Sequence, residues 1–266
     1  MATTNLKPIS LKEQLMIQLD ILKSIRDFCD SHGLRYYLAD GTLIGAIRHN
    51  GYIPWDDDID IEMPRPDYNQ LIELFQEQGH LQLVAPGDKL SRYHHIKIYD
   101  ARTLKIENGV AYKDDYLGVD IDIFALDGSS PDNTEYEEMR DRIYKLYNWY
   151  TIIRCGMTGS LRHKIRVATY KMQHWNANNL IKEAVQLCEK YDYNTSKYAT
   201  RYGRYSKGFR VDKECYESTI MKDFEGELFA IPIGYDKVLR AQFGDYMQLP
   251  PEEKRVTHHN NNVFWK

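Results

Sequence analysis

The stretch LADGTLIGAIRHNGYIPWDDDIDIEM, residues 38–63, contains the features that decide the fold. It predicts a strand, a Gly-Thr turn, a short helix, a loop and a second strand that carries carboxylates. Because successive side chains of a strand point to opposite faces, Asp58 and Asp60 project together, while Ile59 and Ile61 pack into the core. Two adjacent carboxylates repel each other, so we expect a cation beside them, and all-oxygen ligands suit Mg²⁺ or Mn²⁺.

Three interpretations compete for this acidic strand. A lone D-x-D is often a solvated edge strand, but Ile59 and Ile61 favour a buried strand, where unpaired charges are costly. A calcium loop of the EF-hand type fails, because counting from Asp56 puts Ile61 at the sixth position, where Gly is needed, and Asp67 at the twelfth, where Glu is needed. The third interpretation is a nucleotide and metal site.

The Gly41-Thr42 pair supports the third interpretation. It follows an apolar strand predicted over residues 34–40 and opens a short helix. Glycine allows the backbone to approach a ligand closely, and free amide groups at a helix N-terminus suit a phosphate. Such a turn is a weak signal alone, and a stronger one when a carboxylate pair follows on the next strand.

A second acidic strand, VDIDIF, is predicted over residues 119–124. Its aliphatic residues face one way, and Asp120 and Asp122 face the other. Placed beside the first acidic strand, it would complete a site of three carboxylates able to hold two metal ions.

The combination of a Gly-Thr turn, a D-x-D strand and a later carboxylate resembles the nucleotidyltransferase superfamily. More narrowly, residues 38–63 resemble the signature of the LicD family of phosphotransferases without a gap, and residues 121–127 resemble a second family segment, with Ala125 where the family has Pro. The alignment favours Asp122 as the third carboxylate and makes Asp120 the second choice. The resemblance therefore implies catalytic and metal-binding roles for Asp58, Asp60 and Asp122, with Asp120 as a further metal ligand.

Further substrate-binding residues are predicted around these strands. Gly41 and Thr42 would cradle the donor phosphates. Arg48 has a planar fork that suits phosphate oxygens, and His49 beside it is a further candidate for substrate binding, although the two are also typical of a cation pair at a helix C-terminus. Lys97 shares a strand face with neighbouring polar residues; it either pairs with a donor phosphate or the aspartates, or is a solvated lysine. A choline group would need aromatic or acidic neighbours, for which the candidates are the following residues: Trp55, Tyr112, Tyr116 and Trp149.

Composition restricts the class of protein. The chain has 266 residues and a net charge of −4, which gives no electrostatic reason to expect nucleic acid as a partner. Four scattered cysteines show no zinc spacing and suggest a reducing, cytoplasmic compartment. No signal peptide and no apolar run of about 20 residues is present, so we expect no membrane span.

The remaining pattern predicts an α+β fold with a nucleotidyltransferase-like mixed sheet flanked by helices. An amphipathic helix is expected over about 11–31, between Ser10 as cap and Gly33 as stop. We predict a catalytic core over 1–130 and a largely helical and mixed region over 131–266 that completes the donor and acceptor pocket and is not independent. In the second acidic strand, Asp127 is expected at the end, capping a turn.

The family resemblance implies transfer of phosphocholine, or a similar phospho-alcohol, from CDP-choline to a cell-surface glycan precursor such as teichoic acid. A lipid-linked precursor would place the enzyme at the inner face of the plasma membrane, and the basic segment from Arg154 to Lys182 is a candidate contact for anionic lipid or an acceptor pyrophosphate. Two alternatives remain open. One is a metal-dependent glycosyltransferase that uses a nucleotide sugar, and the other is an inactive module that binds glycan or choline.

Overall fold

The computed structural model describes residues 6–75, 78–107, 117–155, 161–172, 176–203, 208–257 and 261–266. Its helices are α1 (Leu11–His32), α2 (Asp40–Arg48), α3 (Arg65–Leu74), α4 (Asn133–Cys155), α5 (Leu161–Met172), α6 (Ala177–Cys188) and α7 (Tyr235–Phe243), with short 3₁₀ turns η2 (Lys213–Tyr216) and η3 (Glu252–Lys254). None of the helices in these ranges is both long and apolar enough to cross a membrane.

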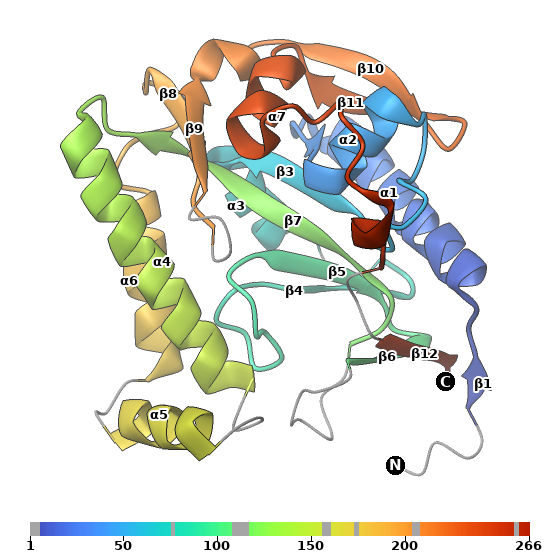
Figure 1. The fold of residues 1–266 in the computed structure, drawn as a ribbon, viewed down its shortest axis with the longest axis horizontal. Coiled ribbons are helices and arrows are strands. Elements are labelled where there is room, and N and C mark those ends of the chain that lie inside the picture. Colours follow the sequence, from blue (N-terminus) through green and yellow to red (C-terminus); the bar gives the residue numbers. More distant parts are fainter. Residues whose placement is uncertain are drawn as a thin grey trace.

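A seven-stranded mixed sheet forms the centre of the molecule (Figure 1). Its strands run in the order β2 (Tyr37–Leu38), β3 (Asp60–Pro64), β7 (Asp120–Ser129), β5 (Ile96–Asp100) and β4 (Leu81–Val84), and β8 (Tyr198–Arg201) and β9 (Phe209–Asp212) extend it from the far end of β7. Strands β3 and β7 are parallel, whereas the other pairs are antiparallel. The mixed sheet with its helices confirms the predicted α+β class.

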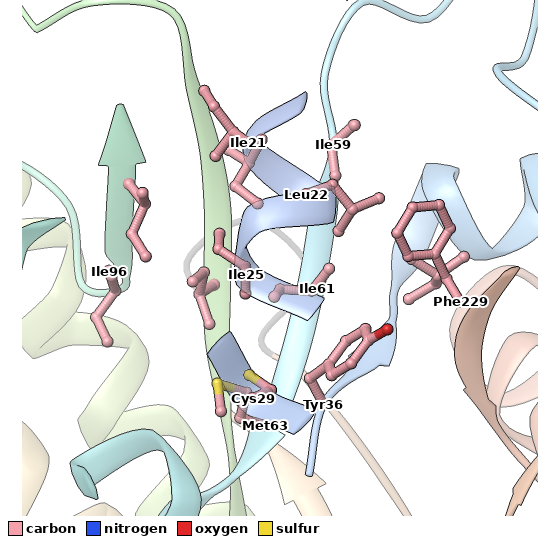
Figure 2. Packing of buried hydrophobic residues seen from close by; sticks show 14 of the residues in the cluster. Ile21, Leu22, Ile25, Cys29, Tyr36, Ile59, Ile61, Met63, Ile96 and Phe229 are labelled. Carbon is pink, nitrogen blue, oxygen red and sulfur yellow. The ribbon is translucent and has the colours of Figure 1, made fainter. Parts of the chain in front are cut away.

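Helix α1 covers the apolar face of this sheet. At the start of α1 the Ser10 side chain accepts a hydrogen bond from the Glu13 amide. Gly33 ends the helix with a φ of 67°, a conformation that glycine adopts without strain. Ile21, Leu22 and Ile25 of the helix lie against the aliphatic residues of β3 and β7 (Figure 2). Burial of this face stabilises the sheet and leaves its other face to the polar side chains.

Two smaller sheets and a helical layer complete the fold. One small sheet has the order β1 (Lys7–Pro8), β12 (Asn261–Trp265) and β6 (Thr103–Glu107), and the other pairs β10 (Thr219–Phe224) with β11 (Glu227–Pro232). Helices α4 and α6 pack together through a separate apolar cluster that includes Ile143, Leu146 and Ile181. The second part of the chain therefore contains α4 to α7 and also the strands β8 to β12.

The structure corrects the predicted place of Asp127. Strand β7 continues to Ser129, so Asp127 lies inside the strand and does not cap a turn. Its buried carboxylate accepts hydrogen bonds from Arg65 Nε at 2.6 Å and Nη2 at 3.1 Å, and this ion pair is the physical reason that it tolerates the strand interior.

Candidate active site

The parallel pairing of β3 and β7 brings the two acidic strands together. In this register Asp60 lies opposite Asp122, and Ile61 lies opposite Ile123 on the core face. Asp58 has the same parity as Asp60 and is close enough to interact electrostatically with it. Asp60 and Asp122 therefore lie side by side on adjacent strands, as the alternation of the sequence indicates. Asp58 precedes the first residue of β3 and lies in the segment that leads into the strand.

The Gly41-Thr42 pair lies in the first turn of α2, directly against the start of β3. Thr42 Oγ1 accepts a hydrogen bond of 2.9 Å from the Asp60 amide, which ties the turn to the acidic strand. A Cβ atom added to Gly41 would lie 2.3 Å from Asp56 Oδ2, so a larger residue would have to displace this carboxylate. Asp40, the first residue of α2, has a φ of 45°, a conformation that non-glycine residues rarely adopt.

Cations hold the β7 end of the cluster. The Lys97 ammonium donates to both Asp120 and Asp122, and Lys105 Nζ donates to Asp120 Oδ1 at 2.7 Å. His95 Nε2 lies 3.1 Å from Asp122 Oδ2. Burial alone would raise the pKa of both carboxyl groups, but these neighbours lower it, in Asp120 through Lys105 and Lys97 and in Asp122 through Lys97 and His95. Asp120 and Asp122 are therefore kept ionised.

The β3 end carries an excess of negative charge. Burial, followed by repulsion from Asp58, Asp40 and Asp122, raises the pKa of Asp60 well above its usual range. Burial and repulsion from Asp58 raise the pKa of Asp56 to about 7. Carboxylates crowded in this way favour either a proton or a bound cation.

An ionic network that sequence reasoning missed supports this end of the cluster. The Arg201 guanidinium of β8 pairs with Asp40, lies 3.4 Å from Glu62 Oε2 and stacks over Phe124, with Cζ 4.8 Å from the ring centroid. Tyr216 donates a hydrogen bond of 2.7 Å to Glu62 Oε1. Glu62 shares the parity of Asp58 and Asp60 and was therefore recognisable as a residue of this face, whereas no local pattern indicated Arg201.

The donor set fits a divalent cation by its chemistry and charge. The oxygens of Asp58, Asp60 and Asp122 are hard ligands of the kind that Mg²⁺ and Mn²⁺ prefer, and the raised pKa of Asp60 reflects a charge that such an ion would neutralise. In the described ranges, however, no three His, Cys, Asp or Glu side chains are already grouped as a metal site. Lys97 and His95 currently occupy the Asp122 oxygens, so a metal would have to compete with them or replace them.

The other predicted binding residues lie at different places. Arg48 is the last residue of α2, where its Nε donates to His49 Nε2 at 2.9 Å, whereas Gly41 is near the first. Lys97, which contacts Asp120 and Asp122, also lines a small, partly open pocket together with Val84, Leu90, Ser91, Arg92, Tyr93, His95 and Leu117.

The aromatic candidates for a choline site are dispersed in the structure. Trp55 lies under Arg255, and Trp149 on α4 lies under Arg142, with the guanidinium carbons 5.5 Å and 5.9 Å from the ring centroids. Tyr112 and Tyr116 lie outside the described residues. The choline box remains a prediction without a defined position.

Comparison with known proteins gives a family match that includes both acidic strands. The family described as "LicD/FKTN/FKRP, nucleotidyltransferase domain" matches residues 33–153. The lipopolysaccharide cholinephosphotransferase LicD of Haemophilus influenzae is 33% identical over 275 residues, which cover 97% of this chain and 99% of that protein. The human ribitol 5-phosphate transferase FKRP is 31% identical over 101 residues, which cover 33% of this chain and 20% of that protein. The mannosyltransferase regulator 4 of Saccharomyces cerevisiae is 27% identical over 135 residues, which cover 48% of this chain and 11% of that protein.

Proposed function

Because the chain belongs to the LicD family, we propose that it transfers phosphocholine from CDP-choline to a hydroxyl group of a cell-surface glycan precursor. The observation that carries the proposal is the register of Asp60 with Asp122, which joins the two acidic strands in a chain that matches a lipopolysaccharide cholinephosphotransferase over its whole length. The acceptor is a teichoic acid precursor or, by analogy with that relative, a lipopolysaccharide.

The reaction exchanges one P–O bond for another. The oxygen of the acceptor hydroxyl attacks the phosphorus that carries choline, the bond from this phosphorus to the CMP oxygen breaks, and the hydroxyl proton is lost. Catalysis of such a transfer depends mainly on positioning and on compensation of negative charge.

The residues of the sheet face have distinct roles in this proposal. Asp58, Asp60 and Asp122 would hold Mg²⁺ or Mn²⁺, with Asp120 as a further ligand if Lys97 and Lys105 released it. The bound metal would supply positive charge and make the acceptor hydroxyl more acidic. The backbone amides at Gly41 and Thr42 orient the donor phosphates. Lys97 keeps the β7 carboxylates ionised, which its contacts with Asp120 and Asp122 support.

The same proposal includes a location for the enzyme. A lipid-linked acceptor would bring a cytoplasmic protein to the inner face of the plasma membrane. Helix α5 is the candidate contact, because Leu161 is 73% exposed and Ile165 is 55% exposed beside the exposed cations Arg162 and Lys164. Apolar side chains flanked by cations are typical of helices that lie on anionic lipid.

The test is an assay of CMP release from CDP-choline in the presence of Mg²⁺, with and without an acceptor glycan. Release that requires the acceptor, and transfer of choline to it, would support the proposal, and parallel reactions with teichoic acid precursor and lipopolysaccharide would identify the acceptor. The cytidine diphosphate ester of ribitol is the competing donor, because FKRP is named as a ribitol 5-phosphate transferase.

Other results would contradict the proposal. Release of a nucleoside diphosphate from a nucleotide sugar would indicate the glycosyltransferase alternative. Binding of choline or glycan without turnover of any donor would indicate the inactive module. The matched control for the CMP-release assay is an Asp60→Asn variant, because the asparagine side chain is nearly isosteric with aspartate but cannot ionise.

A further inference from the structure

Two arginines from distant segments lie at the C-terminal end of α2. Arg48 ends the helix, and Arg255 directly follows η3 near the end of the chain. The guanidinium carbon of Arg255 is 5.5 Å from the centroid of the Trp55 ring, and the same ring is 6.2 Å from that of His49. The Trp55 ring therefore packs against Arg255 and also contacts His49, which accepts a hydrogen bond from Arg48.

Neutral atoms hold both guanidinium groups. Arg48 donates from Nε to His49 Nε2 at 2.9 Å and from Nη1 to the Tyr246 carbonyl at 2.5 Å, and Arg255 donates from Nε to the Pro250 carbonyl at 2.8 Å. A guanidinium has five N–H donors, so several donors of each fork remain without a partner among the described residues.

Most ion-paired arginines of the chain differ from this pair, although Arg154 and Arg210 also donate to carbonyl or amide oxygens. Carboxylate partners are present for Arg26, Arg35, Arg65, Arg102, Arg142, Arg201 and Arg240. In the part of the chain that the structure describes, neither Arg48 nor Arg255 has one. Burial, followed by repulsion from Arg255, lowers the pKa of Arg48, as expected for cations that share a site without a counter-charge.

The position of these cations relative to the acidic strands suggests a ligand. Arg48 lies seven positions after Gly41 along α2, which corresponds to about 10 Å at the rise of an α-helix. Trp55 is followed directly by Asp56, whose carboxylate packs on Gly41. The two ends of α2 thus present a carboxylate cluster and, about 10 Å along the helix, two arginines that have no carboxylate partner among the described residues.

We propose that Arg48 and Arg255 form a subsite for the nucleotide phosphate of the donor, the phosphate that leaves as CMP. Planar guanidinium forks bind phosphate oxygens in pairs, and a fixed positive charge at this point would offset the charge that develops on the departing group. In this proposal the C-terminal segment takes part in ligand binding through Arg255, which follows η3. The identity of the nucleotide rests on the function proposed above, whereas the anion site itself rests on the two arginines.

The direct test is calorimetric titration of the full-length protein with CMP, with cytidine and with inorganic pyrophosphate, in the absence of metal. We expect Arg255→Ala to weaken binding of CMP and pyrophosphate by about ten- to a hundredfold, the usual effect of losing a hydrogen bond to a charged group. Cytidine has no phosphate, so its affinity should stay the same. Arg255→Lys keeps the charge but loses the fork, and it should show an intermediate loss.

A matched control is Arg142→Ala. This arginine also stacks on a tryptophan, Trp149, but it forms an exposed ion pair with Glu183 at 2.5 Å. The control should bind CMP as the unaltered protein does. Equal affinity for CMP in Arg255→Lys, in Arg255→Ala and in the unaltered protein would overturn the proposal, and the conservative lysine variant provides this test even if the alanine variant does not fold.

Failure of the subsite and failure of the proposed reaction give different results. If phosphocholine transfer occurs and Arg255→Lys leaves the KM for CDP-choline unchanged, the subsite is wrong and the reaction stands. If no phospho-alcohol donor is turned over but binding of CMP and pyrophosphate still depends on Arg255, the reaction is wrong and the anion subsite stands.

Discussion

Glu62 gives the sharpest quantitative prediction, because its environment is fully defined. The side chain is fully buried on β3, accepts a hydrogen bond from Tyr216 and lies near Arg201. Burial raises its pKa from 4.5 to about 7, although Arg201 and Tyr216 act in the opposite direction. Glu62→Gln keeps the shape of the side chain and an acceptor for Tyr216 while removing the ionisation.

The direction in which the free energy of unfolding changes with pH follows from proton binding by Glu62. Between about pH 4.5 and 7 the folded protein holds a proton on Glu62 that the unfolded chain has released, so the contribution of Glu62 to stability is lost as pH rises through this range. The difference between the two pKa values corresponds to about 3 kcal/mol. We therefore expect Glu62→Gln to match the unaltered protein at pH 4.5 and to exceed its free energy of unfolding by up to about 3 kcal/mol at pH 8.

The assay is urea unfolding followed by circular dichroism at several pH values, without divalent cations. Glu137→Gln is the control, because Glu137 is exposed on α4, and it should leave the pH dependence unchanged. If Glu62→Gln lost stability with rising pH as steeply as the unaltered protein, the burial argument for Glu62 would be refuted.

Three further predictions follow from the site and its supports. Without divalent cations at pH 8, Asp60→Asn should raise the melting temperature by a few degrees in a thermal scan, since it removes a buried charge beside other carboxylates, while transfer activity is lost. Arg65→Ala should lower the free energy of unfolding by about 3 to 5 kcal/mol in urea, because it leaves the Asp127 carboxylate buried and unpaired. The double variant Leu161→Glu with Ile165→Glu should reduce co-sedimentation with phosphatidylglycerol vesicles by at least about tenfold, since it removes two exposed apolar side chains from a basic helix.

Each of these has a control and a contrary result. Restoration of activity by Mg²⁺ in Asp60→Asn would contradict the role of that carboxylate. If Arg65→Ala lowered the free energy of unfolding by less than about 1 kcal/mol, the Arg65–Asp127 ion pair would contribute no more than a weak surface pair, which contradicts the prediction. Met221→Glu with Leu228→Glu changes exposed apolar residues on the β10–β11 hairpin and should leave vesicle binding intact, and equal losses in both double variants would remove the assignment to α5.

The alternation of acidic and aliphatic residues was sufficient to predict the two acidic strands, because a period of two is a local property of the chain. The same pattern placed Asp58, Asp60 and Asp122 on one face. It did not indicate Arg201, whose role depends on the pairing of β8 with β7, a contact between segments about seventy residues apart. Asp127 was misplaced for a similar reason, since its partner Arg65 belongs to a different element and only the folded chain brings the two charges together.

Gly41 and Arg48 illustrate the limit of a short motif. The motif predicts that both residues face a phosphate, and the structure places them near opposite ends of α2, with Gly41 at the carboxylate cluster and Arg48 near Arg255. The C-terminal partner of Arg48 could not be inferred, because Arg255 reaches it only through the fold of the last segment.

The most direct test of the central claim is an anomalous difference map from crystals grown with Mn²⁺ and CDP-choline. We expect manganese density at about 2.1 Å from oxygens of Asp58, Asp60 and Asp122, in contact with the donor phosphates. Manganese bound elsewhere, with these three carboxylates apart and the donor away from α2, would contradict it.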